Sequence, residues 1–174
     1  GERPETFGLD AAVEFPPLHA RPYAGLAPQP FNPANAGRLL DWTGYVEDSR
    51  AYADPGFRLF RTLCPSWDNE ARRPGKGALL MGSSPPGYQE WLRNAVADTV
   101  DRFADPDERL VFVNAWNEWA EGAHLEPDRR HGYSYLEAHR VGLVRSGLAV
   151  AARNGRPAGH RPRLAAVIHA FYPT

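Results

Sequence analysis

The chain has 174 residues with 43% hydrophobic and 24% charged side chains, a composition typical of a globular protein with one hydrophobic core. Lysine and arginine number 20 against 21 aspartates and glutamates, and the densest basic run, residues 72–76 (RRPGK), is short, so we expect no nucleic-acid partner. The single cysteine, Cys64, excludes an internal disulfide, and no apolar run approaches the roughly 18 residues of a membrane span.

The N-terminal part predicts one strand, a long loop, a short helix and a second strand. Residues 7–15 (FGLDAAVEF) are mostly apolar and end at a proline pair, which is typical of a buried strand. Residues 16–33 contain six prolines and show no hydrophobic period, so we expect an irregular loop. A helix over residues 43–53 and a strand over residues 57–63 (FRLFRTL) follow, and this strand leads into residues 64–69 (CPSWDN).

The clearest predicted helix begins after Ser84, whose hydroxyl can cap it and which precedes two prolines at positions that tolerate them. Its apolar residues obey the i, i+3, i+4, i+7 rule and predict one buried face, while Arg93, Asp98 and Arg102 are expected in water. The buried face comprises Tyr88, Trp91, Leu92, Ala95, Val96, Thr99, Val100 and Phe103. Residues 105–107 (DPD) end this helix.

The C-terminal part continues the same pattern. It predicts a buried strand over residues 110–116 (LVFVNAW), a long helix over residues 133–154 with Gly155 past its end, and a strand over residues 164–171. Strands and helices that alternate in this way predict an α/β fold.

Residues 111–128 (VFVNAWNEWAEGAHLEPD) carry the clearest chemical signal in the chain. If the strand alternates regularly, Asn114, Trp116 and Glu118 share one face, which a purely structural strand would not need. Glu118 and Glu121 stand three apart, and a helical turn there would bring their Cβ atoms to about 5–6 Å from each other. Glycosidic chemistry uses such a pair, because one acid protonates the leaving oxygen while the other acts as base or nucleophile.

Two tryptophans, Trp116 and Trp119, flank the glutamates, and flat apolar rings beside acids suit the C–H faces of a sugar. The alternative is that both glutamates lie at a helix N-terminus, where negative charge is stabilising without any chemistry. The spacing alone leaves both interpretations open.

Three motifs together resemble the WbsX-type family, the glycoside hydrolase family 99-like domains. They are residues 10–16 (DAAVEFP), 65–72 (PSWDNEAR) and 114–128 (NAWNEWAEGAHLEPD), and they occur in the family's order. The resemblance covers about residues 7–145. It implies a (β/α)8 barrel of the TIM type that acts on bacterial surface polysaccharide, either lipopolysaccharide O-antigen or capsule, by a retaining mechanism without a cofactor or metal ion.

The resemblance also implies roles for the two glutamates. Glu118 would take the proton of the sugar 2-hydroxyl, so that this oxygen attacks the anomeric carbon. Glu121 would protonate the departing oxygen and later activate water. Ala120 stands where the hydrolases of the family often carry histidine, so two alternatives stay open: a glycosyltransferase that depends on a nucleotide sugar, and a non-catalytic glycan-binding scaffold.

A second group of candidate residues follows the strand over residues 57–63, where barrel enzymes place binding residues. The group comprises Trp67, Asp68, Asn69 and Arg72, and its alternative interpretation is a plain turn. The predicted substrate-binding set comprises Trp67, Asp68, Asn69, Arg72, Trp116, Asn117 and Trp119.

Several other polar residues have weaker signals. Glu14 also closes a strand, and its alternative role is a loop carboxylate paired with an arginine. His124, Glu126 and Asp128 alternate as metal ligands sometimes do, but we interpret them as support for the catalytic loop. Asp105-Pro106-Asp107 has the Asp-x-Asp form by which many nucleotide-sugar transferases hold a metal, yet a turn between helix and strand explains it better.

The chain is expected to be part of a barrel, because a whole one takes about 250 residues. We expect residues 1–155 to be the C-terminal portion of the barrel, with three or four strands in an open sheet and helices on one side. Residues 156–174 would be a linker and the first strand of a following domain. The remainder of the parent polypeptide would complete the site, so the isolated chain is expected to be inactive and of low stability.

The predicted compartment is the bacterial cytoplasm. Only Lys76 stands against nineteen arginines, which indicates a GC-rich bacterial genome. The expected partners are an oligosaccharide or polysaccharide substrate and the rest of the parent polypeptide.

Overall fold

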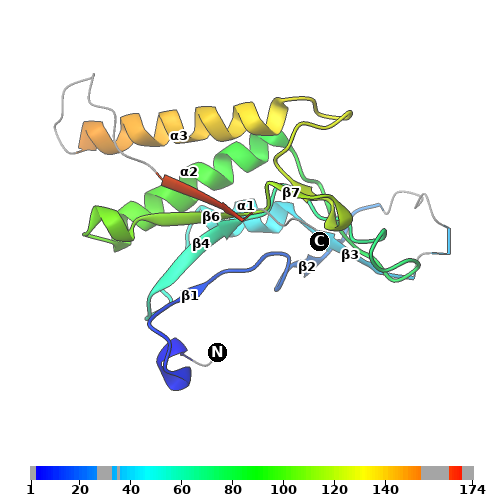
Figure 1. The fold of residues 1–174 in the computed structure, drawn as a ribbon, viewed down its shortest axis with the longest axis horizontal. Coiled ribbons are helices and arrows are strands. Elements are labelled where there is room, and N and C mark those ends of the chain that lie inside the picture. Colours follow the sequence, from blue (N-terminus) through cyan, green and yellow to red (C-terminus); the bar gives the residue numbers. More distant parts are fainter. Residues whose placement is uncertain (1–2, 27–32, 35, 154–164, 170–174) are drawn as a thin grey trace.

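The structure is a computed structural model that describes residues 3–26, 33–34, 36–153 and 165–169. These residues form an α/β protein with three α-helices and both parallel and mixed sheets, which confirms the predicted class (Figure 1). The helices are α1 (Thr43–Ser49), α2 (Pro85–Arg102) and α3 (Ser134–Arg153), with 3-10 turns η1 (Pro4–Phe7), η2 (Pro106–Glu108) and η3 (Trp119–Glu121). The strands are β1 (Ala12–Val13), β2 (Arg21–Pro22), β3 (Arg38–Asp41), β4 (Leu59–Leu63), β5 (Ala78–Met81), β6 (Leu110–Asn114), β7 (Asn117–Glu118), β8 (Ala123–His124) and β9 (Ala165–His169).

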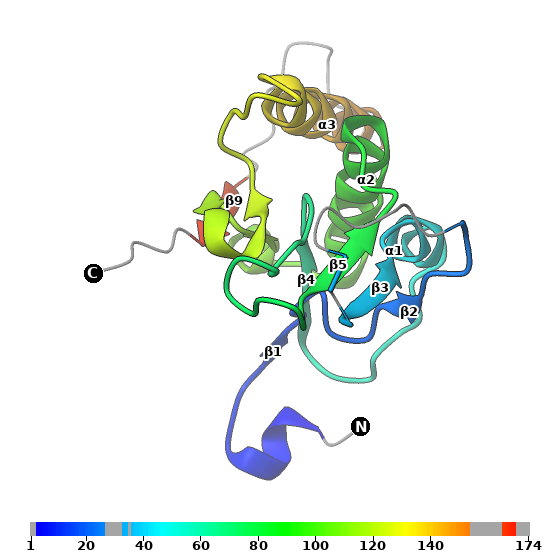
Figure 2. The same cartoon turned by 90° about the vertical axis from the view of Figure 1, so that its right-hand side faces the viewer.

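The main sheet contains four parallel strands in the order β1-β4-β6-β9, which is also their order along the chain. Helix α2 connects β4 to β6 and packs on both strands, and α3 packs along α2 on the same side of the sheet (Figures 1 and 2). The sheet is open within the described part of the chain. The prediction of three or four strands with helices on one side is therefore confirmed for α2 and α3.

A smaller sheet in the order β2-β3-β5 lies beside the main one. None of its three strands is predicted from the sequence. β2 pairs antiparallel to β3, and β3 pairs parallel to β5. β3 and β5 have four residues each, too short to display a hydrophobic period. β2 lies within the segment expected to be irregular. It contains Pro22, which an edge strand tolerates because one side of its backbone needs no partner in the sheet.

Helix α2 begins at the residue that the sequence predicts. The Ser84 hydroxyl accepts a hydrogen bond from the Gly87 amide at 3.3 Å, and the helix spans Pro85–Arg102. Its predicted apolar face is buried from Tyr88 to Thr99, and Arg93 is exposed as expected. The two helices approach closely at Gly142 of α3, where a Cβ would lie 2.8 Å from Leu92 Cδ2.

The expectation that Asp98 and Arg102 lie in water is wrong. Arg61 projects from β4 toward α2 with a side chain only 5% exposed, and a buried guanidinium requires carboxylate partners. Asp98 Oδ2 accepts hydrogen bonds from Arg61 Nε at 2.7 Å and from Arg102 Nε at 2.9 Å. Glu14, after β1, supplies the second carboxylate at 2.6 Å from Arg61 Nη1. This network joins β1, β4 and α2.

Some element boundaries differ from the predicted ones. β1 is shorter than the strand predicted over residues 7–15, because η1 occupies Pro4–Phe7 and ends at Gly8 with φ 70°. α1 ends at Ser49, four residues before the predicted end. β6 ends at Asn114, two residues before the predicted end at Trp116.

The last strand lies in the main sheet. β9 pairs parallel with β6, with Ala165 opposite Leu110 and His169 opposite Asn114. Residues 154–164 and 170–174 lie outside the described residues, and so do the predicted Gly155 cap and most of the predicted linker. The domain boundary at residue 155 therefore stays a prediction. In the described part of the chain, no helix combines the length and apolarity needed to cross a bilayer.

Candidate functional site

The candidate site lies at the carboxyl ends of β4 and β6, where two loops meet. One loop follows Leu63 and the other follows Asn114. The Asp68 amide donates to the Glu121 carbonyl at 2.8 Å, and the Ser66 hydroxyl donates to the Gly122 carbonyl at 2.5 Å. Parallel α/β enzymes carry their functional residues at this end of the strands.

The two predicted catalytic glutamates come together over one guanidinium. Arg72 Nη2 donates to Glu118 Oε1 at 3.1 Å, and Arg72 Nη1 donates to Glu121 Oε1 at 2.9 Å. The side chains of Glu118 and Glu121 are 10% and 19% exposed, whereas that of Arg72 is 44% exposed. Two largely buried carboxylates thus share a cation that reaches them from the solvent side.

A tight hairpin positions the glutamates. β7 pairs with β8, Asn117 opposite His124, and η3 closes the hairpin between them, so the predicted helical turn after Glu118 is confirmed as a 3-10 turn. Gly122 ends this turn with φ 60°, and a Cβ there would lie 2.8 Å from the Asp68 amide nitrogen. Gly122 is a functional position that the sequence predictions missed. A glycine directly after the second glutamate is the signal that could have indicated this close approach of the hairpin to the Asp68 backbone.

The turn that carries Arg72 is held by its own polar groups. Asn69 is buried, and its Oδ1 accepts from the Ala78 amide at 2.7 Å, while the Arg72 amide donates to the Asn69 carbonyl at 3.1 Å. The Glu70 carboxylate accepts from the amides of Gly75 and Gly77 at 2.7 Å and 3.1 Å. Asn69, predicted to bind substrate, therefore supports the turn. The backbone of Arg72 is fixed, and its side chain extends from a rigid base.

The three predicted tryptophans differ in exposure. Trp67 is buried in the core and Trp116 is half-buried, as is the neighbouring Asn117. Trp119 is 50% exposed and stacks on the His124 ring, with the ring centroids 3.9 Å apart. Trp119 Nε1 donates to Glu126 Oε2 at 2.7 Å, which fixes the orientation of the indole ring. Trp119 therefore keeps a fixed, half-exposed ring in the turn that lies between Glu118 and Glu121 in the sequence.

The pKa of Glu121 is set by effects that oppose each other. Burial raises the pKa of Glu121 above its ordinary value, and the charge of Glu118 acts in the same direction. The guanidinium of Arg72 opposes both effects and favours the carboxylate form of Glu121. The net pKa of Glu121 is raised, which is the direction that a general acid requires.

Other polar residues singled out in the sequence are engaged elsewhere. Glu14 pairs with Arg61 and accepts from the Thr62 amide at 3.2 Å, so its alternative role as a paired loop carboxylate is confirmed. The expectation that Asn114 shares a face with Trp116 and Glu118 is wrong, because the strand ends at Asn114. Its Nδ2 donates to the Pro16 carbonyl at 2.9 Å and ties β6 to the loop after β1.

His124, Glu126 and Asp128 contribute to the loop that surrounds Trp119. His124 Nε2 lies 4.0 Å from Asp128 Oδ2, and Asp128 Oδ1 accepts from the Arg130 amide at 2.8 Å. Within the ranges that the structure describes, no group of three or more histidine, cysteine or acidic side chains is arranged to hold a metal ion.

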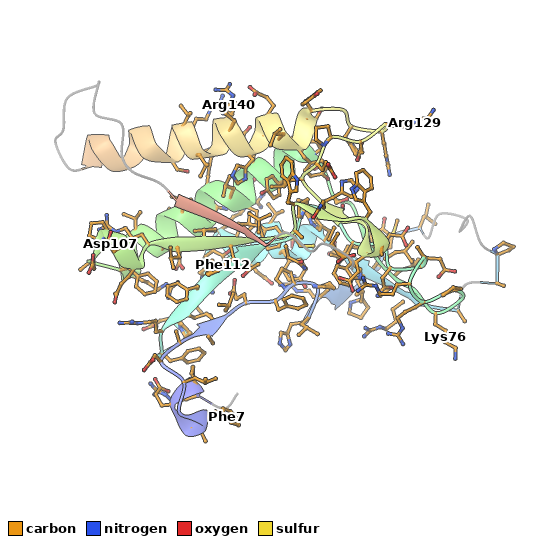
Figure 3. All side chains as sticks on the ribbon, in the orientation of Figure 1. Phe7, Lys76, Asp107, Phe112, Arg129 and Arg140 are labelled. Carbon is orange, nitrogen blue, oxygen red and sulfur yellow. The ribbon has the colours of Figure 1, made fainter. Side chains whose placement is uncertain are left out.

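The Asp-x-Asp sequence is a turn, as expected. Asp105 Oδ1 accepts from the Asp107 amide at 2.9 Å and caps η2, which leads into β6. Figure 3 places Asp107 at the opposite end of the molecule from Lys76 and Arg129, which lie in the loops at the carboxyl ends of the strands.

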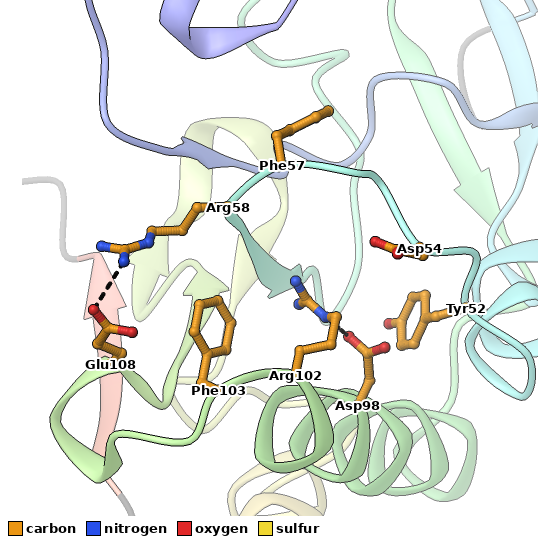
Figure 4. A pocket seen from close by; sticks show the side chains of 8 residues that line it. All are labelled: Tyr52, Asp54, Phe57, Arg58, Asp98, Arg102, Phe103 and Glu108. Carbon is orange, nitrogen blue, oxygen red and sulfur yellow. Dashed lines mark hydrogen bonds and ion pairs between the residues drawn. The ribbon is translucent and has the colours of Figure 1, made fainter.

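A cavity of about 590 Å³ lies near the amino end of β4, away from the glutamates (Figure 4). Four of its charged side chains neutralise each other, because Arg58 pairs with Glu108 and Arg102 pairs with Asp98, both at 2.9 Å. Asp54, also in the lining, accepts a hydrogen bond from the Gly56 amide at 2.9 Å. Paired charges at the amino ends of parallel strands serve stability, so we assign no binding role to this cavity.

The chain is similar in sequence to proteins of one family. The model of the family described as "Glycosyltransferase WbsX" matches residues 2–139. Two uncharacterized proteins named WxcX, from two strains of Xanthomonas campestris pv. campestris, are 44% and 43% identical to the chain over 144 residues. The matched region is 82% of this chain and 21% of each relative, so the chain spans about a fifth of the length of these relatives. No solved structure matches the chain.

Proposed function

The chain belongs to the glycosyltransferase WbsX family, and on that premise we propose that it carries the acid and the base of an enzyme that cleaves or transfers glycosidic bonds in bacterial surface polysaccharide. Membership of the family indicates a carbohydrate-active enzyme with a role in polysaccharide biosynthesis. The observation that carries the finer proposal is the convergence of Glu118 and Glu121 on one guanidinium at the carboxyl ends of the parallel strands.

The proposed reaction has two steps. In the first, Glu118 takes the proton of the sugar 2-hydroxyl, this oxygen bonds to the anomeric carbon, and the departing glycosidic oxygen takes the proton of Glu121. In the second, Glu121 takes a proton from water as the water oxygen bonds to the anomeric carbon. The bond between the anomeric carbon and the 2-oxygen breaks at the same time, and Glu118 returns its proton to the 2-oxygen. Two inversions leave the anomeric configuration retained. A sugar hydroxyl in place of water would give transfer instead of hydrolysis.

The surroundings of the pair fit this chemistry. The raised pKa of Glu121 favours the protonated form that a general acid uses. The exposed face of Trp119 can stack on a sugar ring, and the bond from its Nε1 to Glu126 keeps that face in place.

The strand order supports a barrel as the parent architecture. Consecutive parallel strands lie side by side in chain order, β1-β4-β6-β9, without the reversal of order that marks the binding crevice of a doubly wound sheet. In this proposal the complete polypeptide acts in the bacterial cytoplasm, and its other parts supply the remaining wall of the cleft.

A second candidate function is a glycan-binding scaffold that makes no use of the acids. The two largely buried carboxylates argue against it, because a binding platform gains little from two acids that repel each other in a partly desolvated site. The third candidate, transfer from a nucleotide sugar, uses the same acids and differs in its donor.

The test is an assay of the complete polypeptide with lipopolysaccharide from Xanthomonas campestris, the organism of both relatives. Release of oligosaccharide that survives EDTA supports the hydrolase. Incorporation of sugar that requires a nucleotide-sugar mixture assigns the transferase. Binding without turnover, unchanged in a Glu118→Gln, Glu121→Gln double variant, would leave the scaffold and overturn the proposed enzyme.

A further inference from the structure

Arg72 occupies the position that a substrate needs. Its two terminal nitrogens lie against Glu118 Oε1 and Glu121 Oε1, so the guanidinium fills the gap between the proposed base and the proposed acid. In the proposed reaction the sugar 2-hydroxyl must reach Glu118 and the glycosidic oxygen must reach Glu121. Both oxygens would have to enter the space that the guanidinium now fills.

The exchangeable member of this trio is the arginine. The carboxylates are largely buried in a hairpin whose backbone is bonded to the neighbouring loop, whereas the Arg72 side chain is almost half-exposed. Asn69 and Glu70 fix the backbone below Arg72, so a change in its side-chain rotamers alone can withdraw the guanidinium into solvent. An exposed, flexible side chain loses little stability when it leaves an ion pair.

The bridged arrangement also opposes the proposed chemistry. Among the described residues, Arg72 and Glu118 shift the pKa of Glu121, and the charge of Glu121 acts on the thiol of Cys64. Glu118 raises the pKa of Glu121, and Cys64 is neutral because burial raises the pKa of its thiol. Arg72 is the member of the three that favours the ionised carboxylate, and an ionised Glu121 has no proton to give to a leaving oxygen.

We propose that Arg72 is a positioning residue that acts as a latch, holding both carboxylates in an ion-paired resting state until a sugar displaces it. On displacement the 2-hydroxyl replaces Arg72 at Glu118, the glycosidic oxygen replaces it at Glu121, and Glu121 takes up a proton from solvent. This inference rests on the proposed function of the same site. In the empty site the guanidinium neutralises two carboxylates that would otherwise repel each other.

The resting state can be tested without turnover, through the protonation of Glu121 in the complete polypeptide. A water-soluble carbodiimide with glycine ethyl ester modifies protonated carboxyl groups, and peptide mass spectrometry follows the modification of Glu121 against pH. We expect the midpoint to shift to higher pH in Arg72→Gln, because the cation that favours the carboxylate is removed. Arg72→Lys keeps the charge and should lie close to the wild type.

The matched control is Arg73→Gln, which removes the same charge from the exposed neighbouring position and should leave the midpoint unchanged. Circular dichroism shows whether Arg72→Gln folds, and Arg72→Met, which retains more of the aliphatic stem, replaces it if it does not. A midpoint of Glu121 that is the same with and without Arg72 would overturn the latch.

Displacement by substrate has its own readout in the pH profiles of lipopolysaccharide turnover. The profile of kcat/KM reports ionisations of the free enzyme and that of kcat reports those of the complex. In Arg72→Gln the alkaline limb of kcat/KM should move to higher pH, while the limb of kcat stays in place. An equal shift of both limbs would mean that Arg72 stays on the carboxylates in the complex, which overturns the displacement step.

The two proposals fail in different ways. Absence of turnover in the wild type under every donor condition would remove the proposed function and the displacement step with it. The labelling midpoint of Glu121 would still decide whether Arg72 controls its protonation in the resting state.

Discussion

Glu121 combines partial burial with a hydrogen bond to a half-exposed arginine, and these properties set its expected role. Glutamine keeps the shape of the side chain and can still accept from Arg72, but it has no acidic proton. We expect Glu121→Gln in the complete polypeptide to lower kcat by about 10²–10⁴-fold while glycan binding stays near the wild-type value. Turnover and equilibrium binding of lipopolysaccharide measure the two quantities separately.

The control for this variant is Glu137→Gln on α3, an exposed glutamate paired with Arg140 and remote from the hairpin. It should leave both kcat and binding unchanged. If Glu121→Gln lost binding as strongly as turnover, Glu121 would be a ligand for the glycan and not its acid.

Gly122 is the second residue on which the site depends. Its φ of 60° is unfavourable for alanine, and a Cβ would also lie 2.8 Å from the Asp68 nitrogen. Gly132 has a similar φ of 53°, but a Cβ added there would meet nothing within 4 Å, so it isolates the backbone effect. We expect Gly132→Ala to lower the local stability by about 1–2 kcal/mol, and Gly122→Ala to cost about 1–3 kcal/mol more.

Hydrogen exchange of peptides from residues 115–133 measures these losses in the complete polypeptide as free energies of local opening. Equal losses in the two variants would show that the contact between Gly122 and Asp68 contributes nothing.

The network around Arg61 shows how elements are joined in this fold. Arg61 is enclosed by β1, β4 and α2 and uses carboxylates from Glu14 and Asp98. Because a buried cation that loses a partner keeps its desolvation cost, we expect Asp98→Asn to destabilise the contact between α2 and β4 by about 3 kcal/mol. Hydrogen exchange of α2 peptides checks this. The control is Glu90→Gln on the same helix, which removes an exposed ion pair with Arg50 and should change stability by less than about 1 kcal/mol.

The α2–α3 contact contains a buried histidine, and this predicts a dependence of stability on pH. His139 Nδ1 lies 2.9 Å from the Tyr88 hydroxyl, and burial lowers the pKa of His139 below its ordinary value of 6.5. Below pH 6.5 the unfolded chain binds a proton that the folded chain does not, so stability is full above this pH and falls as the pH decreases toward the folded pKa.

Exchange rates of α3 amides, corrected for their intrinsic pH dependence, should therefore show weaker protection at pH 5 than at pH 7. His139→Gln should lose most of this dependence, whereas His19→Asn, at an exposed position, should retain it. Protection that is equal at both pH values in the wild type would contradict the assignment.

Long periodic patterns within one segment could be predicted from the sequence, whereas contacts between distant segments could not. Helix α2 could be predicted with its cap because 18 residues repeat a period and Ser84 marks the start. β3 and β5 could not, because four residues in a short parallel pair carry no pattern of their own. The glutamate pair could be predicted from a motif, but its bridge to Arg72 could not, since 46 residues separate the partners and only the meeting of two strand ends joins them.

The whole molecule exposes apolar side chains along its first strand. Residues of η1, β1 and the following loop are more than half exposed or close to it, including Phe7, Leu9, Val13, Phe15 and Leu18. We expect the isolated 174-residue chain to associate through this edge, and Val13→Lys to reduce the association. Light scattering after size-exclusion chromatography measures it, and a monodisperse monomer at high concentration would contradict the expectation.

The hydrogen bonds that join the site link segments far apart in the chain, such as the bond from Asp68 to Glu121 and the one from Asn114 to Pro16. Closing loops of this length carries an entropy cost that is repaid only after β4 and β6 have paired. The site should therefore assemble after the transition state for folding of the sheet. Substitutions in it should accelerate unfolding and leave the folding rate nearly unchanged, whereas substitutions in the β4–α2–β6 unit should slow folding.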